Sequence, residues 1–148
     1  MNLPEYTDIK TRTTQDGKHE VLDPLRQRFV TLTPEEWVRQ HFVNYLIKFM
    51  GYPQALMGNE IEIHVGTKKL RCDSVLFTKE RQPRAIIEYK AESIPLSEKV
   101  ITQIATYNML LHADYLMVSN GNQHICLHYD HEKSSWHDLP AIPRYEEL

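Results

Sequence analysis

The chain has 148 residues, of which 41% are hydrophobic and 25% are charged, and its formal net charge at pH 7 is -3. This length and balance predict one soluble globular domain over residues 1–148, and they exclude a membrane-spanning helix because no apolar run is long enough. An acidic net charge argues against broad attraction to nucleic acid, which needs clustered lysines and arginines. The N-terminus lacks the basic and apolar regions of a secretory signal, and Cys72 and Cys126 are too few for a disulfide framework. We therefore expect a cytoplasmic protein with reduced cysteines.

The first part of the sequence predicts a β-hairpin. Residues 6–23 alternate loosely between polar and apolar side chains around Asp16-Gly17, a dipeptide that suits the positive backbone angles of a tight turn. We interpret residues 1–25 as a hairpin extension of the domain.

A helix should follow this hairpin. Thr33-Pro34-Glu35-Glu36 has the features of a helix start, because Thr33 can act as the cap, Pro34 fits the first turn and Glu36 completes a capping box. We expect the helix to run to about Met50 and to stop at Gly51. Its apolar stripe has the spacing of one buried face and consists of Val38, Phe42, Tyr45, Leu46 and Phe49.

The middle of the chain predicts three strands and a second helix. Alternation and short apolar runs place the strands at residues 60–65, 70–77 and 85–89. The helix should run from Leu96 to about His112. Its apolar residues keep helical spacing and are Leu96, Val100, Ile104, Tyr107 and Leu111.

The last part of the chain predicts another hairpin and a tail. A strand at residues 115–118 should turn at Asn120-Gly121 into a strand at residues 123–129. The proline-containing tail, residues 139–148, should wrap the surface or be mobile. This order of elements predicts an α/β fold with one mixed sheet and packed helices, in which residues 85–118 form a βαβ crossover.

Two acids and a lysine should meet at one edge of that sheet. Side chains alternate along a strand, so Glu88 and Lys90 point to the same side, while Asp73 lies near the start of the preceding strand. Mg²⁺ and Mn²⁺ prefer carboxylate oxygens, polarise phosphoryl oxygens and lower the pKa of bound water. A neighbouring ammonium group orients that water and stabilises developing charge. The set suits metal-assisted phosphodiester hydrolysis, although E-x-K taken alone more often means a surface ion pair.

The residues around the two acids are mostly basic. Between Gly66 and Lys90 the acids are Asp73, Glu80 and Glu88, and the bases are Lys68, Lys69, Arg71, Lys79, Arg81, Arg84 and Lys90. Such a region fits phosphate binding and fits equally well a solvated sheet edge with basic loops.

Several motifs together carry a resemblance to a known family: LTPEEWVRQHFVNYLI, GYP, KLRCDSVLF, AIIEYKAE, QIATYN and YLMVSNG. From about Asp23 to Tyr129 the chain resembles the N-terminal nuclease domain of type I restriction enzyme R subunits, as a stand-alone relative within the PD-(D/E)xK superfamily. In that superfamily an acid on one strand and E-x-K on the next form the active site. The proline that often precedes the acid is absent here, where the sequence reads RCD.

The resemblance implies a restriction-endonuclease-like mixed β-sheet flanked by helices, and cleavage of DNA with Mg²⁺ or Mn²⁺ as cofactor. It implies that Asp73 and Glu88 hold the metal and that Lys90 orients or activates water. Its partners would be DNA and either restriction-system subunits or a second copy of the chain.

The resemblance also implies roles for residues on both helices. Gln103 and Tyr107 share a helix face at a spacing of four and would contact DNA or orient catalytic groups beside the active site. Glu35, four residues before Arg39, would complete the metal shell, whereas Glu36 already has a capping role.

Two alternatives accompany these expectations. His124, Cys126 and His128 alternate on one strand and are too extended to close a tetrahedral metal site, so we expect a polar strand face there. The rival function is a non-catalytic nucleic-acid-binding or assembly module that keeps the fold. An intact set of two acids and a lysine argues against this rival, since a pure binding site has no need for carboxylates near phosphate.

Overall fold

The computed structural model describes residues 1–5 and 8–148 as two sheets, two α-helices and three short 3-10 helices. The strands are β1 Thr11–Thr13, β2 His19–Asp23, β3 Arg28–Thr31, β4 Met57–Val65, β5 Lys68–Phe77, β6 Pro83–Tyr89, β7 Tyr115–Ser119, β8 His124–Asp130 and β9 Ser135–Asp138. The helices are α1 Pro34–Lys48 and α2 Glu98–Asn108, with the short turns η1 Gln54–Leu56, η2 Met109–Leu111 and η3 Tyr145–Glu147. Within the described residues, no helix has both the length and the apolar character needed to cross a membrane.

The larger sheet has the strand order β4-β5-β6-β7-β8-β9. Each neighbouring pair is antiparallel except β6 and β7, which run parallel because α2 crosses over between them. The predicted βαβ crossover is therefore confirmed, and the fold is the expected mixed α/β sheet flanked by helices.

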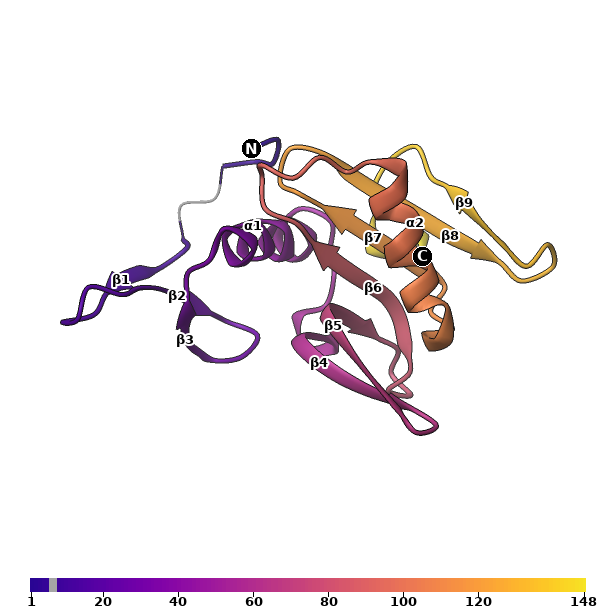
Figure 1. Ribbon diagram of the computed structural model, residues 1–148, viewed down its shortest axis with the longest axis horizontal. Coiled ribbons are helices and arrows are strands. Elements are labelled where there is room, and N and C mark those ends of the chain that lie inside the picture. Colours follow the sequence, from indigo (N-terminus) through magenta and orange to yellow (C-terminus); the bar gives the residue numbers. More distant parts are fainter. Residues whose placement is uncertain (6–7) are drawn as a thin grey trace.

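Helices cover both faces of this sheet (Figure 1), as its alternating side chains require. On β6, Ala85 and Ile87 pack in a cluster with the buried face of α1, whereas Ile86 packs in a second cluster with residues of α2. Glu88 lies two residues after Ile86 on the same strand, so its side chain points to the same face of the sheet, the one that α2 covers.

The N-terminal hairpin is present and has one more strand than expected. β1 and β2 pair antiparallel around the turn at Gly17, whose φ of 83° needs a residue without a side chain, and β3 then pairs with β2. Figure 1 shows this small sheet projecting beyond α1, away from β7–β9. The predicted segment began at Tyr6, which with Thr7 lies outside the described residues.

The helix boundaries agree with the sequence, but three details of the prediction are wrong. Thr33 caps α1 by accepting a hydrogen bond from Glu36 N at 3.0 Å, yet the Glu36 carboxylate turns to arginines and does not complete a capping box. Phe49 and Tyr107 were expected on apolar stripes but are 44% and 45% exposed. Each lies at or near a helix end, where the packed core no longer covers the stripe.

The C-terminal tail wraps the end of α1. Ile142 is buried in the α1 cluster, Tyr145 N donates to Met50 O at 2.9 Å, and Tyr52 Oη donates to Pro143 O at 2.9 Å. Residues 139–148 were expected either to wrap the surface or to be mobile, and the structure shows them packed on the surface. β9 was missed because its short polar sequence has no strand alternation.

A chain of buried charges joins the small sheet to α1. Asp23, 0% exposed, pairs with Arg26 and accepts a hydrogen bond from Asn59 Nδ2 at 3.0 Å. Arg26 also pairs with Glu36, which is 4% exposed, and Glu36 pairs with Arg39 Nε at 3.0 Å. Charges this deep require their partners, because an unpaired buried ion is very costly.

Arg39 carries the network from α1 into the larger sheet. One terminal nitrogen donates to Asp73 O at 2.7 Å, and the other donates to Glu60 Oε1 at 2.7 Å. Glu60 in turn accepts a hydrogen bond from Arg71 Nε at 2.6 Å. The guanidinium group therefore ties α1 to β4 and β5 at the position of Asp73.

Replacing Arg39 with methionine should lower the free energy of unfolding by about 3 kcal/mol, because Glu36 and Glu60 each lose one of two arginine partners and the Asp73 carbonyl loses its donor. Urea unfolding would measure this loss. Arg28→Met, at an exposed site on β3, is the matched control and should change stability by less than about 0.5 kcal/mol. Equal effects of the two substitutions would contradict the structural importance of the network.

Candidate active site

Asp73 and Glu88 meet where β5 separates from β6. The ladder between these strands ends at the pair Ser74 and Ile87, and one further step in the same register would place Asp73 opposite Glu88. That pair does not form. Asp73 Oδ2 accepts a hydrogen bond from Tyr89 N at 2.9 Å, so its carboxylate lies between the two strand ends beside the Glu88 carboxyl group.

The other edge of β5 is also distorted at Asp73. The β4–β5 ladder passes from the pair Asn59 and Ser74 to the pair Ile61 and Cys72, without a pair between Glu60 and Asp73. Glu60 has a φ of 55°, in the left-handed region that a glutamate rarely adopts. The Asp73 carbonyl accepts from Arg39 in this gap. Both edges of the strand thus open at the residue that the sequence singled out.

Glu88 is held in an environment that disfavours its charge. Burial, followed by the negative charge of Asp73, raises the pKa of Glu88 to about 9, whereas the Asn108 amide and the positive charge of Lys90 lower it. One carboxyl oxygen, Glu88 Oε1, is buried and has no hydrogen-bond partner among the described residues. Two carboxyl groups are therefore forced together without enough donors to satisfy them.

Lys90 lies just beyond the end of β6 and is half-buried. Its backbone N donates to Ser119 O at 2.9 Å, which continues the alignment of this segment with β7. Its positive charge acts on Glu88, although no direct bond satisfies Glu88 Oε1. The Lys90 charge therefore lowers the pKa of Glu88, and the catalytic role of this lysine stays a prediction.

The two residues predicted on α2 are both exposed. Tyr107 is exposed, and its Oη accepts a hydrogen bond from Arg71 N at 3.2 Å, two residues before Asp73 on β5. Gln103 is exposed one turn earlier on the same helix. Their role in positioning a substrate stays a prediction.

Glu35 is exposed on the first turn of α1. Across residues 1–5 and 8–148, no group of three or more histidine, cysteine or acidic side chains gathers as a metal site. The structure therefore joins Asp73 with Glu88 but does not add Glu35 to them, and its place in a metal shell stays a prediction.

The histidine and cysteine face of β8 is used for packing. His124 Nδ1 lies 2.8 Å from Ser119 Oγ, Cys126 is buried in the α1 cluster, and the His128 ring stacks on Tyr115. The three residues thus make separate contacts, and the face is less polar and more buried than the expected polar strand face.

Two residues near the acids were not predicted as site residues from the sequence. Arg39 supports Asp73 from α1, and the amide of Asn108, 2% exposed at the end of α2, lowers the pKa of Glu88. A signal for Asn108 existed in QIATYN, because an asparagine is a poor residue for the buried face of a helix unless its amide is bonded.

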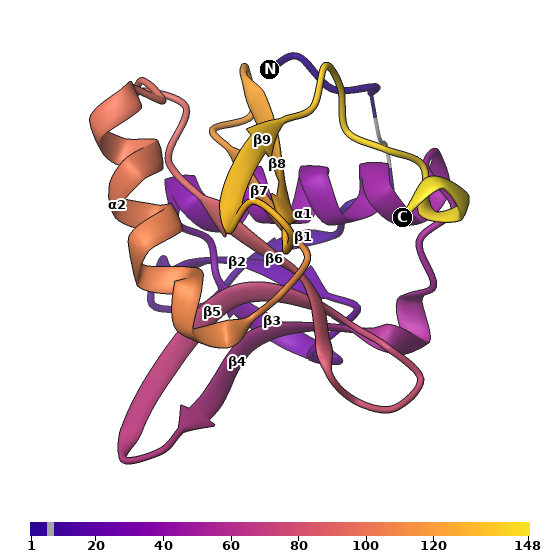
Figure 2. The same cartoon turned by 90° about the vertical axis from the view of Figure 1, so that its right-hand side faces the viewer.

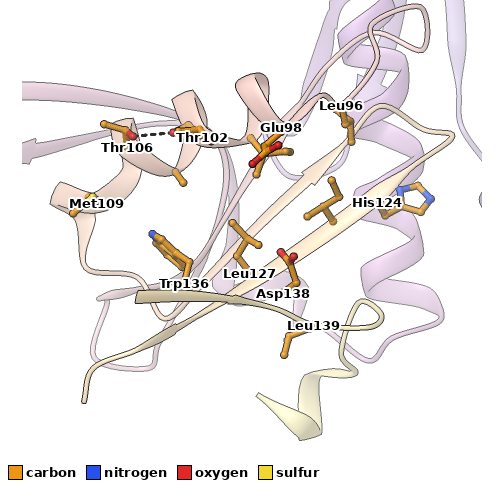
Figure 3. Close-up of a pocket in the computed structure, with 13 residues that line it drawn as sticks. Leu96, Glu98, Thr102, Thr106, Met109, His124, Leu127, Trp136, Asp138 and Leu139 are labelled. Atoms are coloured by element: carbon orange, nitrogen blue, oxygen red, sulfur yellow. Dashed lines mark hydrogen bonds between the residues drawn. The ribbon is translucent and has the colours of Figure 1, made fainter. Parts of the chain in front are cut away.

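A groove of about 690 Å³ lies elsewhere, between α2 and the β8–β9 hairpin. Figure 3 shows Thr102 and Thr106 on its helix wall and Leu127 and Trp136 on its sheet wall. Neither Asp73 nor Glu88 lines this groove, so the acids occupy a separate position.

Replacing Glu88 with glutamine should stabilise the ion-free protein at alkaline pH. In the folded protein the pKa of Glu88 is about 9, so this residue stays protonated up to about that pH, whereas its usual pKa is 4.5. Because the folded pKa is higher, the free energy of unfolding falls as the pH rises through this window, by up to about 1.4 kcal/mol per pH unit. Urea unfolding in EDTA should show Glu88→Gln gaining about 2 kcal/mol over wild type at pH 8 and little at pH 5. No gain at pH 8 would contradict this environment.

Comparison with known proteins places this geometry in a family. None of the curated proteins compared with the chain matches it. Among solved structures, the fold is similar to a fragment described as an HsdR subunit of a type I restriction enzyme from Vibrio vulnificus YJ016, with a TM-score of 0.55 and 21% identity. That match covers 79% of this chain and 24% of the other, so the chain spans about a quarter of the length of its structural relative.

The sequence pattern of a family described as type I restriction enzyme R protein N terminus (HSDR_N) matches residues 34–143, from the start of α1 into the C-terminal tail. This range includes Asp73, Glu88, Lys90 and both helices. Because the match extends over most of its length, the chain belongs to the family of type I restriction enzyme R protein N termini.

Proposed function

We propose that this chain is a divalent-metal-dependent nuclease of the PD-(D/E)xK type that hydrolyses phosphodiester bonds of DNA. The observation that carries the proposal is the meeting of the Asp73 and Glu88 carboxyl groups at the point where β5 leaves β6, with Lys90 beside them. Two adjacent half-buried acids do not stabilise a fold, so their close approach indicates a functional site.

The residues present fit a Mg²⁺ or Mn²⁺ ion. Glu88 Oε1 is a buried acceptor without a partner, and a cation would supply what the described residues do not. Mg²⁺ is commonly bound through one or two carboxylates and keeps several waters, so Asp73 and Glu88 suffice without a third acid. When bound, the ion would polarise a phosphoryl oxygen and lower the pKa of a water molecule.

The protein's own residues would then orient the reaction. Tyr89 N and Arg39 hold the side chain and the carbonyl of Asp73, so this ligand is fixed before an ion arrives. Lys90 would hold the attacking water and stabilise the negative charge that develops on the phosphate.

The surface around the acids suits a phosphate backbone. Lys68 and Lys69 lie at the base of the β4–β5 turn, which Figure 2 shows extending beyond the body of the molecule. Arg71 is on the same strand and bonds to Tyr107 on the rim of α2. These exposed groups, with Gln103, would contact DNA on either side of Asp73 and Glu88.

A non-catalytic DNA-binding or assembly module is the second candidate. It is favoured by the lack of a group of three metal-binding side chains among the described residues. In either case we propose a cytoplasmic protein that acts with DNA and with restriction-system subunits or a second copy of itself.

Addition of Mn²⁺ or Mg²⁺ should raise the melting temperature of the wild-type protein, since an ion that binds the folded state alone adds about 2.7 kcal/mol at a hundred times its Kd. The rise should shrink in Asp73→Asn and in Glu88→Gln. Glu62→Gln removes an exposed carboxylate of β4 and should keep the wild-type response. A rise of equal size in all four proteins would show that the ion binds elsewhere.

Asp73→Asn should abolish nicking of plasmid DNA in Mn²⁺, because an amide is a poor ligand for a hard cation. In EDTA its affinity for duplex DNA should equal or exceed that of wild type, since one negative charge near the phosphates is gone. Lys90→Ala should weaken both nicking and binding.

Two matched variants control for net charge: Asp138→Asn on β9 and Lys133→Ala in the β8–β9 turn, both at exposed positions. Each should nick DNA like wild type. Nicking by Asp73→Asn at the wild-type rate would refute the catalytic assignment, and binding without nicking by every protein would favour the non-catalytic module.

A further inference from the structure

A hollow of about 410 Å³ lies where the start of α1 meets the segment that follows β6. Figure 1 and Figure 2 both show this segment passing beside the first turns of α1 as the chain leaves the end of β6. One wall of the hollow includes Leu32, Pro34 and Trp37, and the other includes Ala91 and Glu92. Its volume is in the range of pockets that bind small organic groups.

Two connections place this hollow next to the acids. Ala91 directly follows Lys90 in the chain, and consecutive Cα atoms are about 3.8 Å apart. On the other wall, Trp37 lies less than one helical turn before Arg39, which donates to Asp73 O at 2.7 Å. If a phosphate of a DNA strand lies at the two acids, a neighbouring base of that strand is within reach of the hollow.

Trp37 is placed at this wall and not in the core. Among the described residues, the two core clusters include Trp136 but not Trp37, which is half-buried. His41, one turn later on α1, packs its ring 4.3 Å from the indole ring at an angle of 64°. His41 Nδ1 also lies 2.8 Å from Trp37 O. A large aromatic ring is therefore held beside the hollow by a neighbour on its own helix.

The walls suit a flat and uncharged group. Leu32, Pro34 and Ala91 offer aliphatic surface, and Trp37 offers an aromatic ring. Among the described residues that line the hollow, the charged one is acidic, Glu92, so a phosphate is disfavoured there and a neutral nucleobase is not. Every base has a π-face that can stack on an indole ring. In a duplex these faces are covered by the neighbouring bases, so a base must leave the stack before it can enter.

We propose that this hollow receives one unpaired nucleobase of the DNA strand whose phosphate lies at Asp73 and Glu88, and that Trp37 stacks on this base. The inference rests on the proposed function, and it narrows the substrate to DNA that contains unpaired nucleotides. Contacts of Lys90 and Arg71 with phosphates carry no information about base pairing. The hollow would therefore add a preference for single strands to a general affinity for DNA.

The experiment measures the binding of fluorescently labelled DNA in EDTA by fluorescence anisotropy. The probes are a short oligothymidylate, the same strand paired with its complement, and an abasic strand of the same length. Trp37→Ala should weaken binding of the oligothymidylate by about tenfold, as loss of one stacking side chain does. It should leave binding of the duplex and of the abasic strand unchanged. Trp37→Phe keeps an aromatic face and should keep most of the affinity.

Phe49→Ala is the matched control, since Phe49 is an aromatic residue that is 44% exposed at the other end of the same helix. This variant should bind all three probes like wild type. Should Trp37→Ala not fold, Trp136→Phe leaves Trp37 as the only tryptophan of the chain. The oligothymidylate should then quench the fluorescence of Trp37, whereas the abasic strand should not.

The outcomes distinguish this inference from the proposed function. An equal loss for all three probes in Trp37→Ala would assign Trp37 to the fold or to the DNA backbone, and no loss would exclude the base from the hollow. Either result overturns the inference, and if Asp73→Asn still abolishes nicking, the proposed function stands. If Asp73→Asn nicks like wild type but Trp37→Ala binds the single strand alone more weakly, the proposed function fails. The hollow would then be a base-binding site of a non-catalytic module.

Discussion

The position of Asp73 depends on one guanidinium group. Arg39 reaches from α1 into the gap on the β4 side of β5, where it takes the Asp73 carbonyl that a regular ladder would have bonded. It is 7% exposed and is balanced by Glu36 and Glu60, so its place is set by charges on two different elements. Because Arg39 and Glu36 are buried, moving either one would leave the other with fewer partners in a place that water does not reach.

This support lets the sheet open at the acids without losing order. On one edge of β5 the Asp73 carbonyl is bonded to Arg39, and on the other its carboxylate is bonded to Tyr89 N. Tyr89 is itself held, since its hydroxyl donates to Ser74 Oγ at 2.9 Å. Tyr89 N and the Asp73 carbonyl, which the breaks in the two ladders release, are therefore bonded, while Glu88 is left with an oxygen that is not. Glu88 Oε1 is the buried acceptor at the acids that an ion would satisfy.

The two helices contribute to the site in different ways. α1 stabilises Asp73 through charge, from the face of the sheet that carries Tyr89. α2 packs on the opposite face, where the Asn108 amide lowers the pKa of Glu88 and Tyr107 accepts a hydrogen bond from Arg71 N on β5. Membership of the R protein N-terminus family covers both helices and the strands between them, so the matched region 34–143 contains every part of this arrangement. The small β1–β3 sheet precedes that region and connects to it through Arg26 and Glu36.

The sequence by itself determined the elements and the pair of acids. Helix and strand periodicity, the cap at Thr33 and the turn at Asp16-Gly17 are local signals, and they predicted α1, β5, β6, β7 and the crossover to within a few residues. Strand alternation also placed Glu88 and Lys90 on one side, because the direction of a side chain along a strand follows from parity alone.

Only the tertiary structure decided what surrounds these residues. Arg39 is 34 residues before Asp73, and the Asn108 amide lowers the pKa of Glu88 through the packing of α2 on the sheet. Neither interaction leaves a periodic trace in the sequence. The expected capping role of Glu36 failed for the same reason, since a local hydrogen bond lost to two arginines that the fold brings to the same carboxylate. Local patterns specify where a side chain points, whereas its partners depend on how separate elements pack, and that is a property of the whole chain.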